Sequence, residues 1–179
     1  MSNLQIIYGY QDIFRKISEP ITIFDESTEK LATDLLDSLY FERAVGIAAP
    51  MVGISKRIIA VDLFENQVKN PIVAINPKIL HKSKETQTFE EQSLCFPDIV
   101  VNVERSKMIE ISYQNPLGET LELKAEGFLS TVIQHEMDYL DGITIFDKVS
   151  KLKRDTLLKK LHKNLKLNPP HVHSSSCRH

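Results

Sequence analysis

The residues of this chain that point most directly to chemistry form the segment Gln134–Tyr139, in which His135 and Glu136 stand together. Tyr139 follows the histidine at a distance of four residues. On a helix, positions i and i+4 share one face, so two histidines at this spacing can hold one metal ion while the neighbouring glutamate acts as general base. Here a phenol replaces the second imidazole, and a neutral phenol is a poor ligand for a divalent metal. The segment has the outline of a metallohydrolase helix that lacks one ligand.

Three stretches of the sequence have the periodicity of helices. They are residues 27–40, residues 127–140 and a segment that begins after Ser150. Leucines recur every four residues in the first stretch, and either Asp25 or Ser27 can cap its start. Gly142 follows the second stretch and is expected to end it in the C′ position, because glycine adopts a left-handed conformation without strain.

Runs of β-branched and apolar residues predict strands between these helices. They are residues 57–63, 72–75, 99–103, 108–113 and 120–124. Residues 114–118, which contain Pro116 and Gly118, are predicted as a turn, because proline fixes φ and glycine permits positive φ. The small residues from Gly46 to Pro50 are also predicted as a turn.

The composition is typical of one globular domain, which we place at residues 1–167. The chain has 179 residues, of which 42% are hydrophobic and 26% charged, and no apolar run is long enough to span a membrane. No secretory signal is recognisable, and the two cysteines, Cys95 and Cys177, do not indicate a disulfide framework. These features predict a protein of the cytoplasm or of an organellar matrix. The Pro- and Ser-rich residues 168–179 are expected to be a disordered tail.

Charge is unevenly distributed along the chain. Residues 148–167 carry eight Lys and Arg against one acid, Asp155, and the rest carries 14 bases against 23 acids, a formal charge of −9. A basic helix on an acidic body can bind a polyanion, or it can be the solvated face of an ordinary amphipathic helix. Both interpretations stay open from the sequence.

Three segments, in order along the chain, resemble the three motifs of the peptide deformylase family. Residues 44–51, Ala-Val-Gly-Ile-Ala-Ala-Pro-Met, resemble Gly-x-Gly-x-Ala-Ala-Pro-Gln. Residues 91–97, Glu-Gln-Ser-Leu-Cys-Phe-Pro, resemble Glu-Gly-Cys-Leu-Ser followed by x-Pro. Residues 134–140, Gln-His-Glu-Met-Asp-Tyr-Leu, resemble Gln-His-Glu-x-Asp-His-Leu. Because all three occur in order, the chain is identified as a member of the family over roughly residues 5–165.

The resemblance implies a fold, an activity and a set of site positions. The fold is α+β, with antiparallel β-sheets around a central motif-bearing helix and with N- and C-terminal helices. The family removes the formyl group from the N-terminal methionine of new bacterial and organellar proteins, and it uses Fe²⁺ or Zn²⁺ held by one cysteine and two histidines. Glu136 occupies the position of the general base, and Gly46 and Leu94 occupy positions of the substrate pocket.

The departures from the family pattern fall on the metal ligands. The three ligand positions hold Ser93, His135 and Tyr139, so one ligand is retained, and Met51 stands where a glutamine amide stabilises the developing oxyanion. Without a metal no water is activated at neutral pH, and losing one oxyanion donor costs about 10²–10³ in rate. We therefore expect an inactive, deformylase-like protein, a pseudoenzyme, with no bound metal or other cofactor.

The individual residues allow more than one role. Cys95 lies two positions from Ser93, a displacement of about 6–7 Å in an extended segment, so a buried thiol is favoured over a replacement ligand. His135 is expected to be hydrogen-bonded within a relict pocket. Glu136 is expected either to be paired with a donor or to have a raised pKa. Tyr139 is expected to pack in the core, and its hydroxyl to bond to Glu136 or Ser93 in place of the metal.

Two other functions stay open beside the inactive deformylase-like protein. One is a divergent deformylase or another metal-dependent amide hydrolase, with a site rebuilt from His135, Glu136 and Cys95. The other is a non-catalytic module that binds nascent peptide N-termini or the ribosome, through the pocket or through the basic helix 148–167. Neither a membrane nor DNA is expected as a partner.

Overall fold

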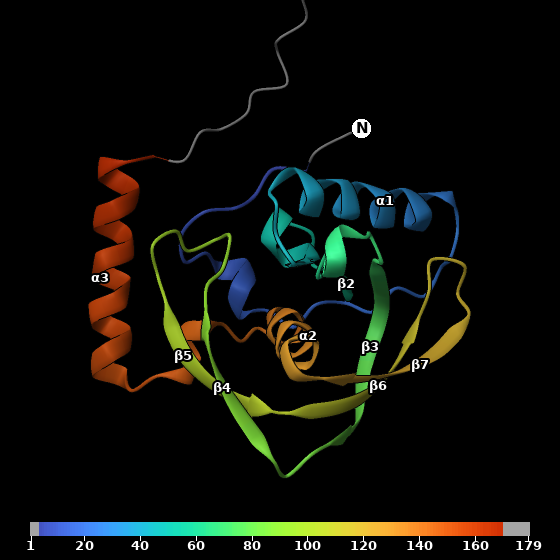
Figure 1. Cartoon of the computed structure of the whole chain (residues 1–179). Coiled ribbons are helices and arrows are strands. Elements are labelled where there is room, and N and C mark those ends of the chain that lie inside the picture. The colour runs from blue at the N-terminus through green and yellow to red at the C-terminus, as the bar shows by residue number, and fades with distance from the viewer. Residues whose placement is uncertain (1–3, 170–179) are drawn as a thin grey trace, which may run out of the picture.

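The computed structural model describes residues 4–169, in which two antiparallel sheets surround a central helix (Figure 1). The larger sheet has the strand order β1-β2-β3-β6-β7, and the smaller one pairs β4 with β5. The strands are β1 (Gly46–Ala48), β2 (Ile58–Val61), β3 (Ile72–Lys82), β4 (Thr86–Glu91), β5 (Val101–Ser106), β6 (Met108–Gln114) and β7 (Thr120–Glu126). The predicted α+β class, with its antiparallel sheets, is therefore confirmed.

The central helix is α2 (Gly127–Leu140), which the chain buries on almost every side. It ends where the sequence predicts, because Gly142 adopts a left-handed φ of 71° two residues after the last helical residue. A side chain at Gly142 would also meet the backbone of Arg15, only 2.8 Å from an ideal Cβ position. The segment after α2 therefore needs glycine both for its conformation and for its close approach to the N-terminal region.

The outer helices are α1 (Glu26–Phe41), which begins at the predicted cap Asp25, and α3 (Lys151–Leu167), which begins after Ser150 as predicted. The side chain of Asp25 accepts hydrogen bonds from the backbone N–H groups of Ser27 and Thr28 and so satisfies two free donors of α1. Four 3-10 helices complete the described elements: η1 (Asp12–Arg15), η2 (Ala49–Val52), η3 (Glu65–Gln67) and η4 (Ile145–Lys148). Figure 1 shows α1 over one end of the large sheet, whereas α3 stands at the edge of the molecule.

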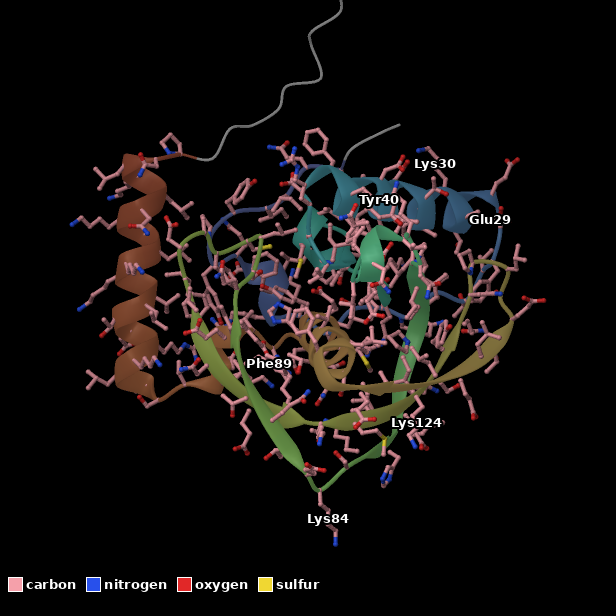
Figure 2. All side chains as sticks on the ribbon, viewed as in Figure 1. Glu29, Lys30, Tyr40, Lys84, Phe89 and Lys124 are labelled. Atoms are coloured by element: carbon pink, nitrogen blue, oxygen red, sulfur yellow. The ribbon has the colours of Figure 1, made fainter. Side chains whose placement is uncertain are left out.

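The predicted strands are present with shifted ends, but two strands escaped prediction. The predicted turn at Gly46–Pro50 is wrong in its first half, because residues 46–48 form β1 and pair with β2 before η2 begins at Ala49. The other missed strand is β4, in which most side chains are polar and every second one is exposed. Phe89, labelled in Figure 2, is its large apolar residue. It packs on Phe128 at the start of α2 with ring centroids 5.5 Å apart.

The N-terminal segment forms backbone hydrogen bonds to two other segments, η2 and the segment that contains Cys95. The backbone N–H of Ile7 donates to the carbonyl of Met51 at 2.8 Å, and that of Gly9 donates to the carbonyl of Cys95 at 2.9 Å. Residues 4–10 therefore fix the positions of two motif segments that lie far apart in the sequence.

None of the helices within residues 4–169 is both long enough and apolar enough to cross a bilayer. The predicted tail, with Cys177, lies outside the described residues except for Asn168 and Pro169. Figure 2 shows long side chains of α3 extending away from the rest of the protein. The side chain of Lys84, at the turn between β3 and β4, also points outward.

Candidate functional site

One cavity of about 510 Å³ is lined by five of the predicted site residues, Gly46, Ser93, Leu94, His135 and Glu136, whereas Tyr139 is not part of its lining. Its walls come from residues 43–46, from residues 90–94 and from the face of α2 between Phe128 and Glu136, and Met51 and Pro97 complete the lining. The buried members of this set form the floor, and the exposed members form the mouth. The three segments that resemble family motifs are thus brought together around a single cavity.

Gly46 and Leu94 both line this cavity, as expected for pocket positions. Gly46 also decides how closely β1 approaches α2. A Cβ atom at Gly46 would lie 2.5 Å from Oε1 of Glu136 and 2.8 Å from Cγ1 of Val132. Any other residue here would push β1 away from the helix, so glycine is needed for the floor of the cavity to close.

Ser93 and Tyr139 are joined by a hydrogen bond of 2.6 Å between their hydroxyl groups. Tyr139 is 1% exposed and packs edge-on against Phe14, with ring centroids 5.4 Å apart. Burial raises the pKa of Tyr139 well above its ordinary value, so the phenol stays neutral. The predicted core packing and the predicted bond to Ser93 are both confirmed, whereas the alternative bond to Glu136 is not formed.

His135 is held by a chain of charged groups that begins at the buried Glu91 and Arg105 and reaches the surface at Lys148. Its Nδ1 atom lies 2.8 Å from Oε2 of Glu91, and the same oxygen accepts a bond of 2.8 Å from Nη2 of Arg105. Arg105 also bonds to Asp138 at 2.8 Å, and Lys148 reaches Asp138 at 2.9 Å. The expectation that His135 is hydrogen-bonded within the pocket is confirmed.

The charges in this chain of groups stabilise one another. Burial alone would raise the pKa of Glu91, but the hydrogen bonds from Arg105 and His135 outweigh it, and the pKa lies below its ordinary value. Sequence reasoning missed Arg105 entirely. The available signal was an arginine at a position of β5 where the alternation of buried and exposed residues predicts a buried side chain.

Glu136 differs from its neighbours because its carboxylate is not paired. The residue is 3% exposed, and its Oε2 atom has no hydrogen-bond partner among the described residues. Burial is the largest of several effects on its pKa and raises it to about 7, whereas the nearby charges of His135 and Arg105 lower it. Of the two expectations for Glu136, the structure supports the raised pKa.

Cys95 is fully buried, as expected for a packed thiol. Burial, together with the negative charge of Glu136, raises its pKa well above the ordinary value, so it is a thiol and not a thiolate. Within residues 4–169 no three His, Cys, Asp or Glu side chains are grouped so that they could hold a metal ion.

The fold and the cavity define an α+β protein in which the helix carrying His135 and Glu136 runs through the core and lines a cavity. The chain belongs to the polypeptide deformylase family, whose sequence model matches residues 3–155. It is 54% identical to a protein of Rickettsia conorii named "Peptide deformylase-like", over 98% of this chain and 96% of that one.

Solved structures agree with this assignment. A peptide deformylase from Legionella pneumophila superposes with a TM-score of 0.88 at 33% identity, covering 96% of this chain and all of the other. A Met-Ala-Ser-bound peptide deformylase from Acinetobacter baumannii superposes with a TM-score of 0.77 at 33% identity, covering 83% of this chain and 100% of that one. The family and the fold inferred from the three motifs are thereby confirmed.

The residues at the ligand positions do not fit the metal that the family resemblance implies. Ser93 and Tyr139 offer neutral hydroxyl groups, and these are bonded to each other. The remaining position is His135, a single imidazole, whereas hydrolytic metal sites use three protein ligands drawn from imidazole, thiolate and carboxylate. No chemical step is therefore assigned to a metal in this chain.

Proposed function

We propose that this chain is a deformylase-like protein that binds the N-terminal end of a peptide in its cavity without hydrolysing it. The observation that carries the proposal is the hydrogen bond of 2.6 Å between Ser93 and Tyr139. It joins the side chains at two of the three positions where the family motifs have metal ligands. His135 alone is too weak a site for a divalent metal, because one imidazole supplies one of the three ligands required.

The rest of the cavity supplies little of the missing chemistry. The pKa of water is about 15.7, and a bound metal lowers it to near 7. Without a metal, the water molecule available to Glu136 is not activated as a nucleophile. Met51 lines the cavity where the family has a glutamine amide, and its thioether donates no hydrogen bond to an oxyanion. The combined losses support a protein without deformylase activity.

Peptide binding is supported by the cavity that remains. Its volume of about 510 Å³ lies within the range of small-ligand sites, and Leu94, Phe128 and Val132 give it apolar walls. The Acinetobacter baumannii relative is described with Met-Ala-Ser bound. A peptide that begins with methionine is therefore the ligand class we propose for this chain.

The proposal is tested by metal content and by hydrolysis measured on the same preparation. The full chain is purified anaerobically, together with a variant in which His171, His173, Cys177 and His179 are changed to Ser, because these tail residues can bind metal adventitiously. We expect far less than one equivalent of iron, zinc or nickel in the variant, and no release of formate from formyl-Met-Ala-Ser. About one metal per chain, lost in His135→Ala, would contradict the proposal.

A divergent hydrolase is the second candidate, and Glu136 is the observation that favours it. A buried carboxyl group with a pKa of about 7 at the floor of a cavity is typical of a general acid–base residue. This function requires formyl-peptide hydrolysis that disappears in Glu136→Gln. The matched substitution Glu122→Gln, which removes the same charge from an exposed position on β7, must leave that activity unchanged.

The basic helix supports a second contact, with ribosomal RNA or another polyanion. Three of its eight cations bond to the body of the protein: Lys148 to Asp138 at 2.9 Å, Arg154 to Asp147 at 3.2 Å and Lys160 to the carbonyl of Asp98 at 2.8 Å. Lys159, Lys163 and Lys166 are exposed and recur on one face of α3. We propose that this face meets the ribosome, in the cytoplasm or in an organellar matrix.

A further inference from the structure

We infer that β7 pairs with β7 of a second copy of this chain, so that the larger sheet continues across a symmetric dimer. The two strands run antiparallel and are centred on Leu123 of each copy. Glu122 of each copy then lies opposite Lys124 of the other. This association does not depend on what the cavity binds, because no residue of β7 lines the cavity.

The strand β7 ends the larger sheet and has a neighbour on one side only. It pairs with β6 over its whole length, from Thr120 opposite Gln114 to Glu126 opposite Met108. Within residues 4–169 no other strand pairs with β7, and no backbone hydrogen bond outside the ladder with β6 involves residues 120–126. Figure 1 shows β7 on the side of the molecule opposite α3. Every second N–H and C=O group of β7 therefore points outward without a backbone partner, and such an edge can accept a further strand.

The two faces of β7 differ in the way that a continued sheet requires. Leu123 and Ala125 lie on the inner face, and their partners on β6, Ile111 and Ile109, are buried. The alternate residues 120, 122, 124 and 126 lie on the outer face and are exposed. Because opposite residues of two paired strands share a face, charged side chains of a second β7 would meet those of the first in water and not in the core.

The charges of β7 favour one register for such a pairing. In a symmetric antiparallel pair, each residue lies opposite itself or a residue an even number of positions away. Centring on Leu123 pairs all seven residues of the strand and brings Glu122 opposite Lys124 twice. Centring on Glu122 or on Lys124 instead places two like charges directly opposite each other, which destabilises a sheet. Centring on Leu121 or on Ala125 pairs only one end of the strand.

The outer face of one copy leaves both of these charges available. Glu122 lies opposite Ser112 on β6, which offers it no charge, and Lys124 lies opposite Glu110. Among the ion pairs of the described residues, none includes Glu122 or Lys124. In the dimer, Glu122 of the second copy would continue the row from Glu110 and Lys124 with a third charge of alternating sign. On the inner side, Leu121, which is 41% exposed, would lie opposite Ala125 of the other copy.

The test is sedimentation equilibrium of the full chain, at low salt and with a thiol reductant that prevents disulfides through Cys177. Concentrations extend to about 1 mM, because one pair of strands buries less surface than a stable interface and associates weakly. We expect an equilibrium between monomer and dimer that shifts to monomer when salt is added, since exposed charges are screened. Monomer alone over the whole range would overturn the inference.

Charge reversals then locate the contact and its register. Lys124→Glu brings two acids opposite each other at both symmetric positions, and Glu122→Lys brings two lysines opposite each other. Each variant alone should therefore dimerise at least about tenfold more weakly than the unaltered chain. An equimolar mixture of the two should recover the dimer, because every acid of one then lies opposite a lysine of the other. Both residues are exposed, and Lys124 is labelled in Figure 2, so neither change disturbs the core.

Glu104→Lys and Lys84→Glu are the matched controls, because both residues are exposed and lie outside β7. Each control, and their mixture, should associate as the unaltered chain does. An equal weakening by the controls would assign the effect to net charge and overturn the inference. A dimer that persists in Lys124→Glu, or a mixture of the two β7 variants that stays monomeric, would also overturn it.

Discussion

His135 directs its Nδ1 atom to Oε2 of Glu91, 2.8 Å away, and so is held as a metal-binding histidine would be although its partner ligands are absent. In metal sites, such a bond to a carboxylate fixes the ring orientation and leaves the other nitrogen for the ion. Glu91 is itself fixed by Arg105. The hydrogen bonds that orient His135 are therefore present, although Ser93 and Tyr139 occupy the other two ligand positions.

This support leads to a restoration experiment. Ser93→Cys and Tyr139→His together should recover the binding of about one zinc or iron per chain, because they return thiolate and imidazole beside a correctly oriented His135. Adding Met51→Gln should raise formyl-peptide hydrolysis by roughly 10²-fold, through the returned oxyanion donor. Metal content and formate release are the measurements. A folded triple variant that binds no metal would show that more than the ligands has changed.

The bond between Ser93 and Tyr139 can be evaluated by a double-mutant cycle. Tyr139→Phe and Ser93→Ala should each lower the free energy of unfolding by about 1 kcal/mol, because the first removes the bond to Ser93 and the second leaves the buried hydroxyl of Tyr139 without its partner. The double variant should lose less than the sum of the two, since neither hydroxyl then remains. Urea unfolding measures all three. Strict additivity would contradict a direct interaction.

Arg105 should be the most sensitive residue of the buried charged groups. Arg105→Met removes the cation that bonds to both Glu91 and Asp138, and the two carboxylates are left buried with reduced compensation. We expect a loss of about 3–5 kcal/mol in the free energy of unfolding. Arg154→Met is the matched control, because Arg154 pairs with Asp147 at the surface and such pairs contribute about 0–1 kcal/mol. Similar losses in both variants would contradict this account.

Glu136 should make the stability of the protein depend on pH in a defined direction. Its pKa is about 7 in the folded protein and lies near its ordinary value of 4.5 when the chain unfolds. Between these values the folded state binds more protons, so the free energy of unfolding falls as the pH rises from 4.5 to 7, by on the order of 3 kcal/mol. Above pH 7 this contribution is constant.

The measurement compares urea unfolding at pH 5 and pH 8 for three proteins. Glu136→Gln should lack the contribution just described, whereas Glu122→Gln should keep the full difference of the unaltered chain. Other groups titrate in the same range, and the comparison between variants removes their effect. An unchanged pH difference in Glu136→Gln would show that this carboxyl group is not the source.

The basic helix should bind polyanions through its exposed face. Changing Lys159, Lys163 and Lys166 to Glu should abolish co-sedimentation with ribosomes at low salt, because these cations are exposed and the body carries a formal charge of −9. Lys160 is left unchanged, because it bonds to the carbonyl of Asp98. Charge reversal of Lys82, Lys84 and Lys124, which are exposed on the sheets or at the turn between β3 and β4, is the matched control. Equal sedimentation of both variants would leave α3 as an ordinary solvated helix.

The sequence predicted best those features that depend on neighbours along the chain. The end of α2 follows from Gly142, and the start of α1 follows from Asp25, so both could be located without a structure. β4 could not be found, because its mostly polar residues become a strand only through pairing with β5. The same holds for β1, whose three small and apolar residues form a strand by pairing with β2.

The same distinction applies to the residues of the candidate site. The meeting of Ser93 with Tyr139 could be predicted, because the three motifs place both residues at ligand positions of one metal. The role of Arg105 could not, because it depends on β5 lying beside β4 and α2 at once. The missing partner of Glu136 is likewise a property of the assembled cavity floor and not of any segment.

The bond between Ser93 and Tyr139 also bears on whether the stability of the folded state depends on a bound ligand. A ligand that binds only the folded protein adds stability in proportion to the logarithm of its concentration. A pair of hydroxyls supplied by the chain itself is present at fixed stoichiometry in every molecule. We therefore expect such a fold to form to the same extent in iron-starved and iron-rich surroundings, and a chelator to leave its stability unchanged.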